Sequence, residues 1–301
     1  MIKGTNNTLQ ALPNNLSEQR KRKIKRILYK IFLYAMLVLG GFIFLLPFLW
    51  MLSTSFKEYK EIFTVPISWI PKTWTLKNYE ELFAASEYVN LWIGFRNTII
   101  MVVPSTIVGV LTAALAAFSF AKIQFPGRDK IFFGFVATMA IPGIITMIPS
   151  YMLYNKLHWT NTWLPLMVPG MFGGASAIFF TRQFMLGIPS SLEEAAKVDG
   201  MGWWGIFWKI EVPLSMPVLI TNFMFGFLGG YNDYTGPMLY LTGKMELKTL
   251  QQMISMLNDT AGTKWGVQMA GACIATLPTL FLYLFAQRYF VEGISFSGVK
   301  E

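Results

Sequence analysis

The chain has 301 residues, of which 54% are hydrophobic and only 14% are Asp, Glu, Lys or Arg. An average soluble domain carries roughly 25% charged residues, so this composition argues against a soluble globular protein and favours a membrane protein. The formal net charge of +9 could suit a nucleic-acid-binding protein, but eight of the 25 basic residues lie within positions 1–30, which argues against that class.

Residues 1–30 form a polar, basic tail in front of the first apolar stretch. The basic run from Arg20 to Arg26 directly precedes that stretch, where basic residues usually keep a terminus in the cytoplasm. The apolar stretch is about twice as long as the core of a signal peptide and follows about 30 polar residues, so we do not expect a cleaved signal peptide.

Six stretches contain no Asp, Glu, Lys or Arg, and each is 21 to 26 residues long. They cover residues 31–56, 97–121, 131–155, 157–181, 212–232 and 265–287. A helix needs about 20 apolar residues to cross the hydrocarbon core of a bilayer. The sequence therefore predicts an all-α membrane protein with six transmembrane helices, and the third and fourth contain helix-breaking prolines such as Pro142 and Pro169.

The distribution of basic residues predicts the orientation. With the N-terminus inside, the inner segments hold 16 Lys and Arg and the outer segments hold 9. This bias comes from the N-terminal segment alone, and it favours cytoplasmic N- and C-termini. The predicted organisation is a cytoplasmic basic tail at 1–30, a six-span domain at 31–290 and a cytoplasmic C-terminal tail at 291–301.

The inner segment between the fourth and fifth stretches is too polar to span a membrane and too patterned for a plain linker. Ser190 or Ser191 can cap a helix, with Glu193 or Glu194 completing a capping box. Gly200 can end that helix in a left-handed conformation. We therefore predict a short helix that projects from the inner face.

The side chains of this predicted helix suggest contacts. Glu193 and Lys197 are four residues apart in the order that favours an ion pair. Ala195 and Ala196 leave little bulk, so another protein surface can approach closely. For Glu194, a helix cap and a contact with a partner are both open.

A second short helix should follow, with Trp203, Phe207 and Ile210 on one face, until Pro213 and Pro217 lead back into the membrane. This segment, at about 188–213, resembles the EAA loop of ABC importer permeases. The resemblance is carried by Glu194, Ala195, Ala196, Asp199, Gly200, Phe207, Ile210, Pro213 and Pro217. From about residue 25 to its end, the chain is similar to the carbohydrate branch of type I ABC importers, specifically to the smaller permease subunit of the maltose importer family.

The resemblance implies a function and a set of partners. The EAA helix would be the coupling helix that docks on an ATPase subunit, through Glu194, Ala195, Ala196, Asp199, Gly200 and Phe207. The chain would work in a bacterial cytoplasmic membrane with a second homologous permease subunit, two ATP-binding-cassette ATPase subunits and an extracellular sugar-binding protein. The cargo would be a sugar, in particular an oligosaccharide. The segment with Asn258, Asp259, Thr260 and Gly262 resembles the loop that contacts the binding protein.

The sequence itself lacks the motifs of an enzyme. It contains no Gly-x-x-x-x-Gly-Lys-Ser/Thr loop, so ATP and Mg²⁺ would be used by partner subunits and not bound by this chain. His158 is the only histidine, and neither a metal site nor a nucleophile–base–carboxylate arrangement can be built around it.

Four residues of the fifth stretch and its end are candidates for the substrate path: Asn222, Tyr231, Asn232 and Asp233. Amides, carboxylates and aromatic faces suit sugar hydroxyls, although the same residues also fit a helix end at the membrane interface. The alternative functions are an ABC importer permease for a non-sugar solute and a gradient-driven secondary transporter. The latter places ionisable residues at mid-membrane, where these stretches have none.

Overall fold

The computed structural model describes residues 13–84, 89–257 and 264–298, and it describes the side chains of residues 20–84, 89–257 and 264–288. Every regular element in these ranges is a helix, as the sequence predicts. The α-helices are α1 (Pro13–Ser55), α2 (Tyr59–Ile62), α3 (Lys77–Phe83), α4 (Leu91–Lys122), α5 (Arg128–Thr138), α6 (Gly143–Lys156), α7 (Leu164–Met171), α8 (Ala175–Met185), α9 (Ser190–Val198), α10 (Trp203–Ile206), α11 (Val212–Leu214), α12 (Met216–Asn232), α13 (Thr235–Tyr240), α14 (Leu250–Met256) and α15 (Trp265–Gly298). A π-helix, η1 (Phe207–Glu211), and a 3₁₀-helix, η2 (Met245–Leu247), complete the set.

Four segments are long and apolar enough to cross a membrane, and there are six if each of two bent helix pairs is one span. The four are Arg20–Ser55, Leu91–Lys122, Leu164–Met185 and Trp265–Arg288. The pair α5 and α6 is bent by 95°, and the segment Trp203–Leu214 meets α12 at 75°. Four to six apolar spans thus coincide with the six charge-free stretches.

Proline and glycine account for the breaks. Pro142 directly precedes α6, and Pro217 lies in the first turn of α12. A proline cannot donate the backbone hydrogen bond that would continue the preceding helix, so each break falls where the sequence removes a donor. Between α7 and α8 the chain turns at Gly173, whose φ of 75° is unfavourable for other residues.

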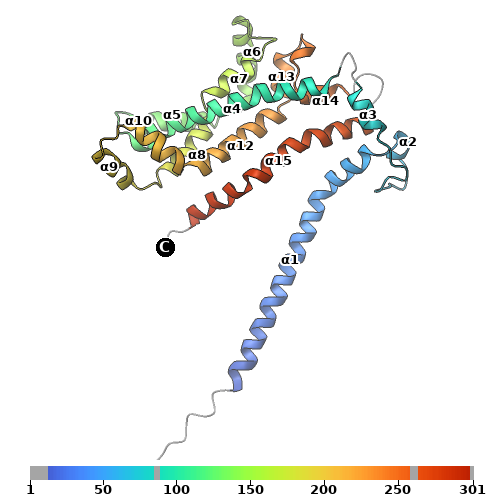
Figure 1. Ribbon diagram of the computed structural model, residues 1–301, viewed down its shortest axis with the longest axis horizontal. Helices are drawn as coiled ribbons and strands as arrows, with labels where there is room; N and C mark the ends of the chain where they lie inside the picture. Colours follow the sequence, from blue (N-terminus) through green and yellow to red (C-terminus); the bar gives the residue numbers. More distant parts are fainter. Residues whose placement is uncertain (1–12, 85–88, 258–263, 299–301) are drawn as a thin grey trace, which may run out of the picture.

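Helix α4 runs through the middle of a bundle and packs against α7, α8 and α12, while α15 packs on α12 (Figure 1). Small residues permit the close contacts. A Cβ atom at Gly109 would lie 2.3 Å from the carbonyl oxygen of Gly170 in α7, and one at Gly226 would lie 2.8 Å from the Thr106 side chain. Close helix approach at glycines is typical of helix packing in membranes.

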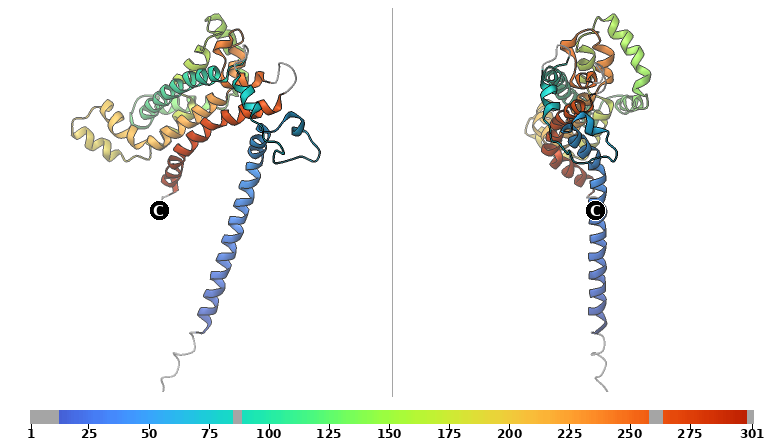
Figure 2. Two further views of the ribbon diagram at one scale, coloured as in Figure 1. Left: turned by 45° about the vertical axis from the view of Figure 1, so that its right-hand side comes forward. Right: turned by 90° about the vertical axis from the view of Figure 1, so that its right-hand side faces the viewer.

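Helix α1 differs from the bundle because it stands away from it for most of its length (Figure 2). Most of its apolar side chains are exposed from Ile24 to Leu52. Its last turn is buried, at Thr54 and Ser55, but the apolar part before it must be covered by lipid or by another subunit, because exposed apolar surface of this extent is not stable in water.

Two buried clusters mark the two ends of the bundle. The first lies at the end that carries α14, which we call the α14 end, and includes Met101, Phe227 and Tyr231. The second lies where α9 projects, which we call the α9 end, and includes Met185 and Phe207. Both clusters draw on α4, so this helix connects the two ends.

Candidate functional site

The loop that contains α9 projects from one end of the bundle, at the left of Figure 1. Helix α9 stops before Gly200, whose φ is 78°. This confirms the predicted helix stop. No atom lies within 4 Å of a Cβ placed on Gly200, so the position is restricted by its backbone conformation and not by space.

The start of α9 differs from the predicted capping box. Pro189 occupies the N-cap position, and no side chain caps the helix there, while Ser190 is already its first helical residue. The predicted box was therefore wrong. Pro189 fixes φ near −60° and begins the helix one residue earlier than a serine cap would.

The predicted pair of Glu193 and Lys197 is also replaced by other contacts. Glu193 Oε1 lies 2.6 Å from Lys122 Nζ, at the end of α4. Lys197 Nζ lies 3.8 Å from the ring centre of Trp203. A local ion pair on an exposed helix face is worth only a few tenths of a kcal/mol, so contacts with buried or aromatic partners outweigh it.

Helix α9 has one buried face and one exposed face. Glu193 and Ala196 are buried, at 5% and 6% exposure, and Ala196 packs in the cluster around Phe207. Glu194 and Ala195 are exposed, as is Asp199 directly after the helix. Of the two alanines, only Ala195 is thus accessible to another protein.

Phe207 holds the loop to the bundle. Its side chain is 2% exposed, and its ring centre lies 5.3 Å from that of Phe118 in α4. Phe207 begins η1, and the wider π-helical turn ends at Glu211, which is fully buried. The structure therefore places Phe207 in the support of the loop and not on its exposed surface.

Lys122 was not singled out in the sequence analysis. Its Nζ lies 2.6 Å from Glu193 Oε1 and 3.3 Å from Glu211 Oε1, and it donates a hydrogen bond to the Ile188 carbonyl. We call Lys122, Glu193 and Glu211 the Lys122 cluster. The available signal was that Lys122 ends a charge-free stretch close to the bilayer, where a lysine needs a partner or water.

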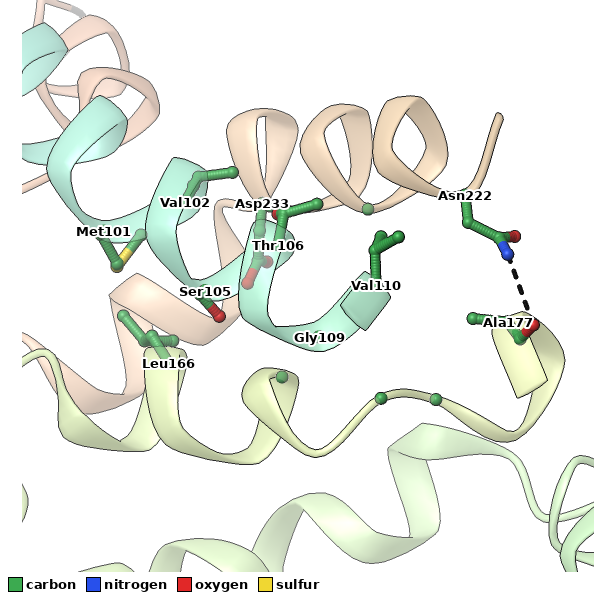
Figure 3. Close-up of a pocket in the computed structure, with 15 residues that line it drawn as sticks. Met101, Val102, Ser105, Thr106, Gly109, Val110, Leu166, Ala177, Asn222 and Asp233 are labelled. Carbon is green, nitrogen blue, oxygen red and sulfur yellow. Dashed lines mark hydrogen bonds between the residues drawn. The ribbon is translucent and has the colours of Figure 1, made fainter. Parts of the chain in front are cut away.

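A cavity of about 250 Å³ lies between α4, the α7–α8 segment and α12 (Figure 3). Its polar side chains are Ser105, Thr106, Asn222 and Asp233. No basic side chain is found among the described residues that line it. The volume is below the roughly 300–1,000 Å³ of a complete small-molecule pocket, so the cavity fits part of a ligand.

The four substrate-path candidates do not all reach this cavity. Asn222 and Asp233 line it, whereas Tyr231 is buried in the cluster at the α14 end and donates a hydrogen bond to the Ala275 carbonyl. Asn232 is exposed and donates to the Leu228 carbonyl of its own helix. The structure thus brings two of the four together.

The two cavity residues are already hydrogen-bonded in part. Asn222 Nδ2 donates to the Ala177 carbonyl at 3.3 Å, as Figure 3 shows. It also donates to Thr181 Oγ1 at 2.8 Å. Asp233 Oδ1 accepts from the Gly236 backbone N–H, at the start of α13. The side-chain oxygen of Asn222 and the second carboxylate oxygen of Asp233 are the groups on these residues that could accept a hydrogen bond from a ligand hydroxyl.

Two further expectations concern segments outside the α9 loop and the cavity. The expected binding-protein contact at Asn258, Asp259, Thr260 and Gly262 lies outside the described residues, between α14 and α15. Within the described ranges, no group of three or more His, Cys, Asp and Glu side chains could hold a metal ion.

Known proteins resemble this chain over most of its length. The family described as "binding-protein-dependent transport system inner membrane component" matches residues 97–295. A probable starch degradation products transport system permease protein of Thermoanaerobacterium thermosulfurigenes is 34% identical over 256 residues, covering 85% of this chain and 91% of that protein. An arabinooligosaccharides transport system permease protein of Halalkalibacterium halodurans is 30% identical over 262 residues, covering 86% of this chain and 92% of that protein.

A solved structure shares the fold. It is a bacterial ABC transporter involved in the import of the acidic polysaccharide alginate, and one of its chains has a TM-score of 0.73 at 22% identity, covering 88% of this chain and 98% of that one. The family match contains α9, the Lys122 cluster and the cavity. This chain therefore belongs to the inner membrane components of binding-protein-dependent ABC transport systems, which are permeases and not enzymes.

Proposed function

We propose that this chain is a permease subunit that moves an oligosaccharide across the cytoplasmic membrane, driven by ATP hydrolysis on separate subunits. The observation that carries the proposal is the exposed face of α9, with Glu194, Ala195 and Asp199, on a loop that projects from the bundle. A rigid helix held to the spans by its other face can transmit a movement of the ATPase to the membrane domain.

The cargo assignment has two supports. Relatives at 30–34% identity are named as transporters of arabinooligosaccharides and of starch degradation products. The cavity offers hydroxyl, amide and carboxylate groups without a basic side chain among the described residues, which suits a neutral polyhydroxylated molecule better than an anionic one. The runner-up is an ABC importer permease for a non-sugar solute, since the fold alone does not select the cargo.

The proposal includes a topology. Each bent helix pair would be one span, giving six, with the N- and C-terminal tails and the α9 loop in the cytoplasm. The support is the basic segment from Arg20 to Lys30, which continues α1 beyond its apolar part. A helix of 43 residues is roughly 65 Å long and exceeds the hydrocarbon core by about 35 Å.

The proposed assembly contains a second homologous permease, two ATPase subunits that use ATP and Mg²⁺, an extracellular sugar-binding protein and surrounding lipid. The part of α1 after Lys30 and the pair α5–α6 are mostly apolar, and no residue of α5 or α6 is buried within the chain, which leaves surfaces for the second permease and lipid. The segment 258–263 would contact the binding protein, and α14, which precedes it in the sequence, lies at the end of the bundle opposite α9 (Figure 1).

The test is ATPase stimulation in the reconstituted complex with its binding protein. We expect stimulation by one or more di- to tetrasaccharides and none by amino acids or peptides. Stimulation by an amino acid or peptide alone would remove the sugar assignment and leave the importer assignment. A gradient-driven transporter would instead take up its cargo without ATP.

A further inference from the structure

The Lys122 cluster places one ammonium and two carboxylates in a largely buried position. The side chains of Lys122, Glu193 and Glu211 are 7%, 6% and 0% exposed. With both carboxylates ionised, the cluster carries one net negative charge. Buried ion pairs rarely add stability over apolar packing, so a position for such a cluster needs a reason other than stability.

The cluster joins three parts of the chain. Lys122 is the last residue of α4, Glu193 lies in the first turn of α9, and Glu211 ends η1 on the way to α12. Lys122 Nζ also donates a hydrogen bond of 2.9 Å to the carbonyl of Ile188, just before α9. Pro189 gives α9 no side-chain cap, and Lys122 contacts the chain on both sides of the helix start, at Ile188 and at Glu193.

The two carboxylates are not equivalent. Glu193 Oε1 is the nearer one, at 2.6 Å from the ammonium, and Glu211 Oε1 is at 3.3 Å. Among the described residues, the buried oxygens Glu193 Oε1 and Glu211 Oε1 meet the ammonium as ion pairs without a hydrogen bond, and Glu211 Oε2 has neither kind of contact. Glu193 is thus the main partner of Lys122, and Glu211 is a second carboxylate that belongs to the support of the loop.

We propose that Lys122 is a positioning residue that sets the orientation of α9 through Glu193. The exposed face with Glu194 and Ala195 would then be presented to the ATPase at a fixed angle. This inference rests on the proposed function for its consequence in transport, but not for its effect on the loop. The competing account is that packing of Ala196 and Phe207 alone holds α9, in which case the charge of Glu193 is irrelevant.

The experiment compares two isosteric changes around one ammonium. Glu193→Gln weakens the link between α9 and Lys122, whereas Glu211→Gln keeps that link and leaves one balanced ion pair. Both are made in a Cys273→Ser background with a spin label on Val198→Cys, a position that is 88% exposed. The mobility of the label and the ratio of transport to ATP hydrolysis are measured in the assembled complex in membranes.

We expect Glu193→Gln to increase label mobility and to lower the ratio of transport to ATP hydrolysis about tenfold, with Glu211→Gln within about twofold of wild type. Lys122→Met should act like Glu193→Gln or more strongly, because it leaves two like charges buried. The proposal is overturned if Glu193→Gln leaves label mobility unchanged, or if Glu211→Gln raises it as much. Suppose that Glu193→Gln increases label mobility but the wild-type complex shows no ATP-driven transport. That result would support the positioning role of Lys122 and would contradict the proposed function.

Discussion

The two ends of the bundle are held by different chemistry. At the α9 end, charged side chains meet one another, with Lys122 between Glu193 and Glu211. These contacts connect side chains, so each depends on the presence of a formal charge. Removing the ammonium of Lys122 would leave two uncompensated carboxylates in a buried site, whereas neutralising one carboxylate leaves a balanced pair.

The α14 end is held by neutral side chains that bind backbone. Asn97 Nδ2 donates to the carbonyls of Glu246 and Lys248, and Thr98 Oγ1 accepts from the Leu250 N–H. Asn97 and Thr98 are both fully buried. Hydrogen bonds of this kind fix one backbone conformation of the connection between α13 and α14, and they carry no net charge.

This contrast indicates different roles for the two ends. The hydrogen bonds at the α14 end stabilise one backbone conformation. At the α9 end, the ion pairs of Lys122 lie next to the exposed face of α9. Charge substitutions should therefore impair function at the α9 end more than at the α14 end, where the loss of a buried amide should impair stability.

The largest effect is expected for the topology, because each position lies either inside or outside the cell and either reacts or does not. In a Cys273→Ser background, a cysteine at exposed Ser191 should be shielded from an impermeant thiol reagent in intact cells, and one at exposed Lys72 should react. Both should react after the cells are opened, which serves as the control. Reaction of Ser191→Cys with the reagent in intact cells would mean that the α9 loop is extracellular. It could then not bind a cytoplasmic ATPase.

Charge reversal should separate the two ends in transport. We expect Glu194→Lys to lower uptake at least about tenfold at a normal level in the membrane, because in the proposed assembly this exposed carboxylate would face the ATPase, and it is not needed for packing. The matched control is Glu246→Lys, an exposed glutamate at the α14 end, which should change uptake by less than about twofold. Uptake at the wild-type rate by Glu194→Lys would contradict the coupling role.

Loss of a buried amide should show the opposite pattern. Asn97→Leu leaves the carbonyls of Glu246 and Lys248 without their donor, and each lost hydrogen bond costs roughly 0.5–1.5 kcal/mol. We expect a lower melting temperature of the purified complex in detergent, with uptake largely kept at a permissive temperature. An unchanged melting temperature would mean that these hydrogen bonds do not hold the α14 end.

The smallest effect is expected at Glu61, in the connection after α1. The backbone N–H of Lys72 donates to this carboxylate and holds the pKa of Glu61 below its ordinary value of 4.5. A lowered folded-state pKa stabilises the fold above about pH 4.5, and this contribution is lost as the pH falls through the lowered pKa. Glu61→Gln should therefore lower the melting temperature slightly at pH 7, and the difference from wild type should shrink at pH 3.

Much of this architecture could be predicted from the sequence. The charge-free stretches coincide with the apolar helices because a charged group inside the bilayer is costly, and that cost acts on each residue locally. The stop at Gly200 was predictable for the same reason, since a left-handed φ is a property of one residue.

The remaining features depend on contacts between distant parts of the chain. Glu193 pairs with Lys122 of α4, whereas the spacing of four residues predicted a pair with Lys197. Tyr231 and Asn222 lie on the same apolar helix, α12, but one is in the core and the other lines the cavity. A helix that is apolar all around gives no periodic signal for its orientation.

The central claim is that α9 presents one face to an ATPase and the other to its own bundle. Ala195 and Ala196 provide the test, because they are neighbours of equal size, one exposed and one buried. Each is changed to cysteine in a Cys273→Ser background, and thiol cross-linking to the ATPase subunit is measured in membranes with the assembled complex. The account predicts a cross-linked product for Ala195→Cys and little for Ala196→Cys, and it is contradicted if Ala195→Cys gives no product or if both give the same amount.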